Sequence, residues 1–310
     1  MACDDWFCRQ LLASALVYVV CVPFYIAFLL AIWRGRGRDE RLRASFFTIS
    51  ISVFQAALHQ WTLSRPRLLG LYYDFYVSLD PWLCNVGHTM ALQMTATQMV
   101  GVCMLSLNRF TAILYPNRHE QLWSGRTLRG FFVLQWAVPT AVFLGWYLQW
   151  VDCTYARSVP NSTVVHLVLR DAHAGYYFLG LTVLSVGSCA LMLPLYAAMV
   201  VHVLTRRSGQ LQWVEIKLAL CAIIIFAQAA GMSYATLEMT MSLDFVSILS
   251  LYYGTMDLLC LTNPFLIVAM STPARQQLLR LLLPARFAPA PLVNARRVQP
   301  VTTVAGPTAH

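Results

Sequence analysis

Long apolar runs alternate with short polar segments along the whole chain of 310 residues. Seven of these runs are long enough to cross the hydrocarbon core of a bilayer, which takes about 20 helical residues. They cover residues 11–33, 44–64, 81–107, 130–151, 176–204, 214–237 and 245–270. The pattern predicts an all-α membrane protein in which residues 1–283 form a bundle of seven transmembrane helices.

A different pattern follows the seventh run. Thr272 and Pro273 are typical of a helix start, and residues 273–283 mix leucines with arginine and glutamine. Such a segment is expected to lie on the inner membrane surface as a short amphipathic helix. Pro284 ends it, and the proline-rich residues 284–310 are expected to form a disordered cytoplasmic tail.

The composition agrees with a lipid environment. Hydrophobic residues make up 58% of the chain and charged residues 11%, whereas about 25% of the residues of an ordinary soluble domain are charged. The formal charge of +9 suggests nucleic acid as a partner, but the basic residues are scattered between apolar runs. We therefore expect membrane lipids, and no nucleic acid, as partners.

The basic residues also set the orientation. Of the 22 lysines and arginines, 17 lie in or beside the connections after the first, third and fifth runs, or in the tail. Cytoplasmic segments carry the excess of positive charge, so the N-terminus is expected outside and the C-terminus inside. The chain then reads as a multi-pass protein of the plasma membrane. Asn161, in an Asn-Ser-Thr sequon, falls in an outer loop as a glycosylation candidate.

Cysteines mark the outer side as well. Five of the nine lie inside the apolar runs, where a thiol usually packs as a small apolar group. Cys84 and Cys153 stand at adjacent outer helix ends, and a disulfide between them is predicted to hold the loop after the fourth run against the third. Pairing of Cys3 with Cys8 in the outer terminus stays open.

Polar residues spaced three or four apart mark one face of the second run. They are Ser45, Thr48, Ser52, Gln55, His59 and Thr62. At that spacing they share one helix face, which is expected to turn away from lipid. Hydrogen bonding between helices is the favoured explanation, ahead of a solvated cavity.

An interior polar site has four candidate residues: His59, His88, Gln93 and Asp257. Asp257 is the acidic residue that lies deep within a run, where a lone carboxylate needs a partner or a proton. A structural role and a ligand- or ion-binding role are both open for it. The seven histidines show no paired ligand spacing, so neither a metal nor a cofactor is expected.

Prolines within the runs predict bends. Pro194 in the fifth run and Asn263-Pro264 in the seventh interrupt backbone hydrogen bonding. Bent helices offer a bundle alternative packings, which suits a switch.

The chain resembles the G-protein-coupled receptors. The shared features are seven apolar runs, an expected external N-terminus, an outer cysteine on the third helix and the pair Asn263-Pro264. The stretch from Leu107 to Thr111, with Tyr115-Pro116 and the segment His119–Trp123, is similar to the nematode serpentine receptor class gamma chemoreceptors. The resemblance implies that the triplet Asn108, Arg109 and Phe110 takes part in G-protein coupling, with Arg109 as the inner cation of the third helix. It also implies an external small-molecule ligand and a heterotrimeric G protein as partners.

Some features depart from the rhodopsin-like pattern. The second run has no aspartate, the sixth has no proline, and Ile267 stands where a tyrosine is expected. The sodium-binding site and the rotation of the sixth helix that are typical of the rhodopsin-like pattern are therefore not expected here. Lys217 is the single lysine, at the inner end of the sixth run, which excludes a retinal Schiff base in the seventh.

The leading hypothesis is a chemosensory receptor that binds an external small molecule and activates a cytoplasmic G protein. A membrane transporter or channel for a small solute is the alternative, disfavoured because no repeat is visible and only one carboxylate lies deep in a run. An enzyme is not expected, since no nucleophile–base or metal-ligand spacing stands out.

Overall fold

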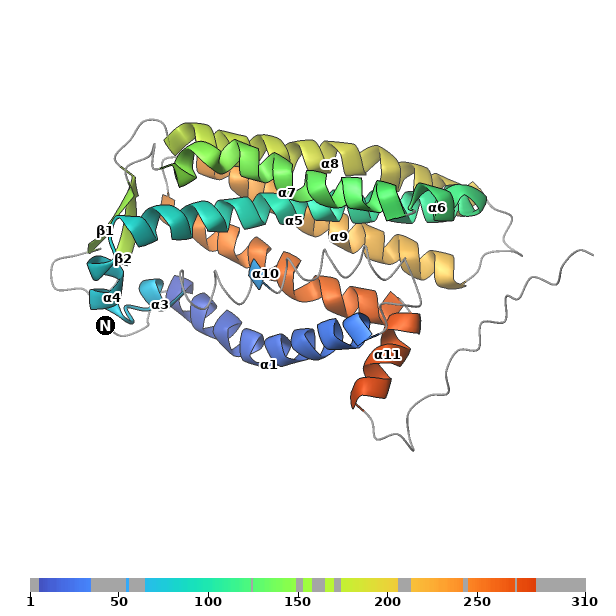
Figure 1. The fold of residues 1–310 in the computed structure, drawn as a ribbon, viewed down its shortest axis with the longest axis horizontal. Helices are drawn as coiled ribbons and strands as arrows, with labels where there is room; N and C mark the ends of the chain where they lie inside the picture. The colour runs from blue at the N-terminus through green and yellow to red at the C-terminus, as the bar shows by residue number, and fades with distance from the viewer. Residues whose placement is uncertain are drawn as a thin grey trace, which may run out of the picture.

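The computed structural model describes residues 6–34, 54–55, 65–123, 125–148, 153–157, 165–169, 174–205, 213–241, 245–270 and 272–282. Its long helices run side by side along the long axis (Figure 1). They are α1 (Trp6–Arg34), α5 (Trp82–Leu114), α7 (Gly125–Tyr147), α8 (Ala174–Thr205), α9 (Trp213–Met241) and α10 (Phe245–Met270). The prediction of an all-α membrane bundle is confirmed. Most of the second run lies outside the described residues.

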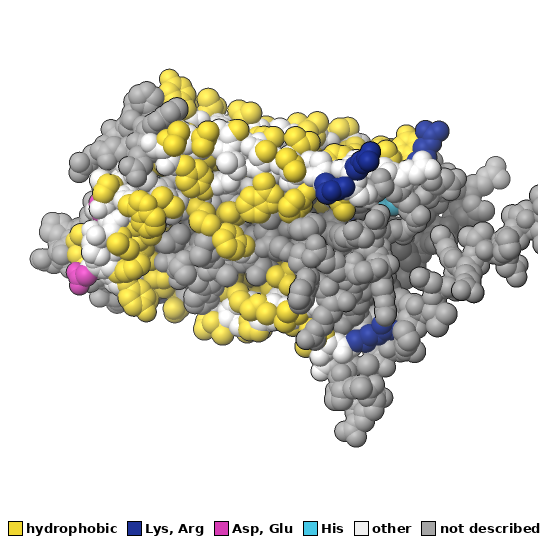
Figure 2. Space-filling view, viewed as in Figure 1, with side chains coloured by type: hydrophobic (Ala, Val, Ile, Leu, Met, Phe, Trp, Pro, Cys, Tyr) yellow, Lys and Arg dark blue, Asp and Glu magenta, His cyan; other side chains and the backbone are white. Residues whose placement is uncertain are grey.

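The lengths of the helices and the side chains on the surface of the bundle both suit a lipid bilayer. Within the described part of the chain, four helices are long and apolar enough to cross a membrane: Leu12–Ala31, Trp82–Leu114, Gly125–Tyr147 and Gly175–His202. Figure 2 shows hydrophobic side chains along the flank of the bundle, with basic side chains at the end near α6 and α11 and acidic ones at the opposite end. This distribution agrees with the predicted inner and outer ends.

Helix α5 is the centre of the bundle. It is mostly buried, whereas the other three candidate spans are mostly exposed at the surface of the bundle. Its buried side chains include Leu92, Met99 and Val102, which belong to a core cluster shared with α7, α8, α9 and α10. At about 1.5 Å per residue, its 33 residues exceed the hydrocarbon thickness. The helix therefore continues beyond the predicted end at 107.

The outer end carries structure that the apolar pattern does not predict. Strands β1 (Cys153–Arg157) and β2 (Val165–Leu169) form an antiparallel hairpin in which Cys153 faces Leu169. Two short helices, α3 (Arg65–Leu68) and α4 (Tyr73–Ser78), lie close to it (Figure 1). Gly70 joins them with a φ of 73°, a left-handed conformation that glycine adopts without strain.

The inner end has two further short helices. Helix α6 (Pro116–Leu122) begins with Pro116 at its first position, so the proline starts a new helix directly after α5 instead of opening a loop. Helix α11 (Thr272–Leu282) takes the place of the expected surface helix 273–283. Its Leu278 is buried with Tyr25 and Phe28 of α1, which anchors it beside the bundle. The predicted tail lies outside the described residues.

Candidate functional site

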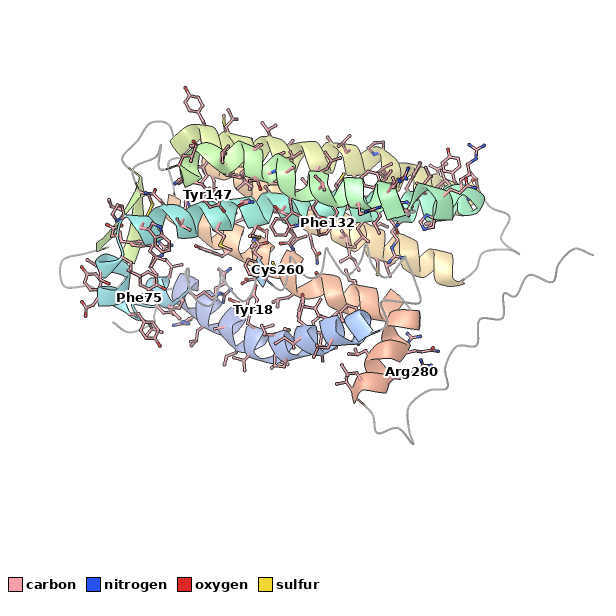
Figure 3. The ribbon with its side chains drawn as sticks, in the orientation of Figure 1. Tyr18, Phe75, Phe132, Tyr147, Cys260 and Arg280 are labelled. Atoms are coloured by element: carbon pink, nitrogen blue, oxygen red, sulfur yellow. A yellow bond between two sulfur atoms is a disulfide. The ribbon has the colours of Figure 1, made fainter. Side chains whose placement is uncertain are left out.

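A buried ion pair lies in the outer half of the bundle. The Nη2 atom of Arg65 lies 2.7 Å from Oδ1 and 2.6 Å from Oδ2 of Asp257, and the side chains are 2% and 9% exposed. The hydroxyl of Tyr18 donates to Oδ1 of the same carboxylate at 2.9 Å, and Nη1 of Arg65 donates to Ser14 Oγ. Helices α1, α3 and α10 are thereby joined around one carboxylate; Figure 3 shows Tyr18 between α1 and α10.

The ion pair explains how a carboxylate is tolerated inside the bundle. Removing one partner of a buried pair costs about 3–5 kcal/mol, because the other charge is left uncompensated. From the sequence alone, Arg65 counts as a cation of the outer loop. The signal in the sequence that could have found Arg65 is that Asp257, inside an apolar run, needs a partner.

Further polar side chains link α5 to α10 and to the second run. The amide of Gln55, on the polar face of the second run, lies 2.9 Å from Thr95 Oγ1 of α5. The same hydroxyl is 3.0 Å from the hydroxyl of Tyr252 on α10, and the thiol of Cys260 donates to Gln98 at 3.3 Å. Gln55 therefore takes part in hydrogen bonding between helices.

The residues predicted to form one interior polar site are not brought together. Asp257 has its contacts on α1 and α3, whereas Gln93 contacts α7: its Nε2 lies 2.6 Å from Thr140 Oγ1, and its Oε1 accepts from the Tyr147 hydroxyl. The ring of His88 lies 5.1 Å from the ring of Trp146, also on α7. His59 lies outside the described residues. Different faces of the central helix α5 contact different helices, so the contacts of Gln93 and His88 with α7 lie apart from the ion pair.

The outer hairpin is attached to α5 through a disulfide between Cys84 and Cys153. Two residues further along β1, the backbone N–H of Tyr155 donates to Asp80 at 3.2 Å, and its ring packs edge-on against Tyr76 at 5.6 Å. Burial raises the pKa of Tyr155 to about 12, so its hydroxyl is neutral at physiological pH. These contacts hold β1 against α4 and the outer end of α5.

Arg109 lies on the last turns of α5 and is half-buried. Asn108 beside it is buried, and the Phe110 ring lies edge-on to Tyr115 at 6.1 Å. Asn108 and Phe110 of the predicted coupling motif are thus packed into the bundle, Asn108 as a buried residue and Phe110 against the core cluster.

Helices α5, α8 and α9 meet close to Arg109. The hydroxyl of Ser106, one turn before it, lies 2.5 Å from the hydroxyl of Tyr196 on α8. The ring of Tyr196 packs edge-on against Phe226 of α9 at 5.7 Å. Changes in the packing of these three helices therefore reach the surroundings of Arg109.

The inner motif after Arg109 folds back on α5. The indole N–H of Trp123 donates to Thr111 Oγ1 at 2.8 Å, and Nδ1 of His119 lies 3.1 Å from the same oxygen. Trp123 also stacks on Phe131 of α7 at 5.1 Å. The spacing Thr111, His119 and Trp123, noted in the sequence as a family resemblance, thus positions α6 between α5 and α7.

The predicted hinges fall within long helices. Pro194 is inside α8, and α10 is helical through Asn263 and Pro264. The structure also contains prolines inside α1 and α7, at Pro23 and Pro139. Asn161, the predicted glycosylation residue, lies outside the described residues.

An apolar cavity of about 410 Å³ lies between α5, α7 and α8. Its lining includes Leu134, Val183 and Leu191, which are among the exposed large side chains of the bundle. The cavity therefore opens toward lipid and lies apart from the ion pair. Among the residues that the structure describes, no group of three potential metal ligands occurs.

Comparison with known proteins agrees with this geometry. A family model for the serpentine type 7TM GPCR chemoreceptor Srv matches residues 15–283. Serpentine receptor class V-1 of Caenorhabditis elegans is 25% identical over 297 residues, covering 86% of this chain and 88% of that receptor. The Drosophila melanogaster octopamine receptor beta-3R is 25% identical over 120 residues, which cover 36% of this chain and 9% of that protein.

The matches confirm a serpentine chemoreceptor, while the gamma class suggested by the inner motif is not confirmed by them. The family model covers most of the chain, from α1 to the end of α11. The chain belongs to the Srv family of serpentine seven-transmembrane chemoreceptors, multi-pass membrane proteins that signal through G proteins.

Proposed function

We propose that this receptor binds a small external molecule in the outer half of its bundle, beside the ion pair of Arg65 and Asp257. The observation that carries the proposal is the ion pair itself, which joins α1, α3 and α10 beneath the outer hairpin. A molecule that contacts one of these charges changes the free energy of the contact between α1 and α10. A ligand shifts a receptor between states only through such a difference in affinity.

Helix α10 offers a route from this site to the inner end. Three residues after Asp257, the backbone carbonyl of Cys260 accepts from the hydroxyl of Tyr25 on α1. The two polar contacts between α1 and α10 therefore lie on the same side of α10, one turn apart. In this proposal, loosening the contact of Tyr18 with Asp257 weakens the contact of Tyr25 with Cys260. Pro264 then allows the inner part of α10 to move.

Arg109 is the proposed contact with a heterotrimeric G protein. Its guanidinium presents several N–H donors in a fixed plane, which suits carbonyl groups at the end of a docked helix. The neighbouring contact of Ser106 with Tyr196 supports this role, since it connects the inner ends of α5 and α8. The sensory role follows from the same scheme: an external small molecule is the input and nucleotide exchange on the G protein is the output. The class gamma assignment rests on the inner motif alone.

Expression in a reporter cell tests the proposal. Cells that carry the receptor and a promiscuous G-protein α subunit are exposed to a panel of small water-soluble and volatile molecules. The proposal expects at least one molecule to produce a second-messenger response, and expects that response to disappear in cells without the α subunit. A current or an uptake that persists in cells without the α subunit would instead support a channel or transporter and overturn the proposal.

A further inference from the structure

A second arginine of the outer end has buried nitrogen atoms that donate to no acceptor among the residues that the structure describes. Arg67 lies on α3, two residues after Arg65, and is only 7% exposed. Its Nε and Nη1 atoms are buried, and neither has a partner in the part of the chain that the structure describes. Arg65, by contrast, donates to Asp257 and Ser14. The two arginines of α3 thus differ: the guanidinium of Arg65 has a counter-charge, and that of Arg67 has an aromatic ring beside it.

The surroundings of Arg67 are aromatic. Its Cζ atom lies 5.7 Å from the centroid of the Tyr155 ring, and Tyr76 packs edge-on against Tyr155. Burial raises the pKa of both tyrosines, that of Tyr155 to about 12, so both hydroxyls are neutral at physiological pH. The carboxylate of Asp80 accepts the backbone N–H of Tyr155 at 3.2 Å. None of these contacts supplies an anion to Arg67.

An unpaired buried cation is expected to have a function. A buried donor without an acceptor costs about 1–3 kcal/mol, and more when it is charged. A site built for an anion bears this cost in the free protein and regains it on binding. Stacking of Tyr155 on the guanidinium holds the group in place, and the disulfide of Cys84 with Cys153 fixes the strand that carries Tyr155.

We propose that Arg67 is an anion-binding residue of the ligand site and that the external molecule is a small carboxylic acid with an aromatic or apolar body. The carboxylate accepts hydrogen bonds from the guanidinium, in a charge-assisted contact. The rings of Tyr155 and Tyr76 lie against the body of the acid. The proposal rests on the proposed function in that it names the ligand class of the same outer site, but its test does not require G-protein signalling.

The first measurement is the thermal stability of the purified, phosphate-free receptor in detergent, with acetate, benzoate and phenylacetate compared with their amides. Acetamide, benzamide and phenylacetamide keep the size of each acid and remove its charge. The wild type is expected to be stabilised by at least one acid more than by its amide, and Arg67→Gln is expected to lose that difference. The matched control is Arg9→Gln, which removes a positive charge from an exposed residue of α1 near the same end and is expected to keep it.

A second variant tests the free protein. Arg67→Met removes the unpaired donors and keeps an unbranched side chain, so the ligand-free receptor is expected to melt at the same temperature as the wild type or higher. A clearly lower melting temperature of Arg67→Met would make Arg67 a structural residue and overturn the proposal.

Two outcomes of the acid measurement would also overturn it. The first is that no acid stabilises the wild type more than its amide does. The second is that added phosphatidylglycerol, and none of the acids, stabilises the wild type but not Arg67→Gln, which would assign Arg67 to a lipid headgroup. A reporter-cell screen without any response, together with a charge-dependent stabilisation that Arg67→Gln loses, would reject the proposed signalling and keep the anion site.

Discussion

The guanidinium of Arg65 lies 2.6 Å from the carboxylate of Asp257, although 192 residues separate the two in the chain. The contact links the outer end of the second run with the middle of α10. It is buried, and Tyr18 of α1 donates to the same carboxylate. Three elements therefore depend on one charge pair.

Asp257→Asn is expected to lower thermal stability strongly. Asparagine still accepts from Tyr18, but it leaves the Arg65 cation buried without a counter-charge, at a cost of about 3–5 kcal/mol. Arg65→Gln combined with Asp257→Asn removes both charges and is expected to be more stable than Asp257→Asn alone. Melting of the purified receptor measures both variants. Asp74→Asn is the control, since Asp74 is an exposed carboxylate at the same end. If the loss of thermal stability in the double variant equals the sum of the losses in the two single variants, the two charges do not interact.

Cys84→Ser and Cys153→Ser are each expected to reduce the amount of receptor at the cell surface. The disulfide closes a segment with a sequence separation of 69 residues, for which the chain-entropy account gives about 4 kcal/mol. The double variant is expected to be no worse than either single one, because the first change already breaks the bond. Cys221→Ser, at a free and partly buried thiol, serves as the control. Additive losses in surface labelling would show that the two cysteines act separately.

Trp123→Phe is expected to lower the melting temperature by about 2–4 °C. The change removes the N–H that donates to Thr111 and keeps a ring against Phe131. A hydrogen bond of this kind contributes about 0.5–1.5 kcal/mol net, and 1 kcal/mol corresponds to a few degrees in a chain of this size. Trp82→Phe is the comparison, because Trp82 is 56% exposed. An equal effect of the two changes would remove the structural role assigned to the inner motif.

Much of the bundle follows from the sequence, because lipid forces apolar residues into long helices. The apolar runs account for α1, α5, α7, α8, α9 and α10, and the basic loops for the inner end. Helix ends are less well predicted: α5 extends to Leu114, since a helix does not have to stop where the hydrocarbon ends. The hairpin at β1 and β2 is missed because two five-residue strands leave no pattern comparable to that of a span.

The site is harder to predict than the bundle. Asp257 stands out in the sequence as a carboxylate that needs a partner, but its pairing with Arg65 depends on how the outer end of the second run meets α10. Gln93 and His88 share α5, and the contacts described for them are on α7 and α8, away from Asp257. The sequence shows which polar residues share a helix, but the packing of the helices decides which neighbouring helix each of them contacts.

The orientation of the receptor in the membrane is open to a direct test. An epitope added after His310 is expected to be labelled only in permeabilised cells, and one added before Met1 in intact cells, because basic residues gather at the inner end. Asn161→Gln is expected to abolish a glycosidase-sensitive shift in mobility. Labelling of the C-terminal epitope in intact cells would reverse the orientation.

Receptor-stimulated nucleotide exchange in Arg109 variants tests the central claim most directly, namely that the inner end of α5 activates a G protein. An interfacial anchor needs only positive charge, so in that case Arg109→Lys is silent. A coupling contact needs the planar guanidinium. We expect Arg109→Lys and Arg109→Ala to reach the surface, to bind ligand as the wild type does, and to lose most surface-normalised exchange. Full exchange by Arg109→Lys would make Arg109 a membrane anchor, and normal exchange by Arg109→Ala would contradict the account.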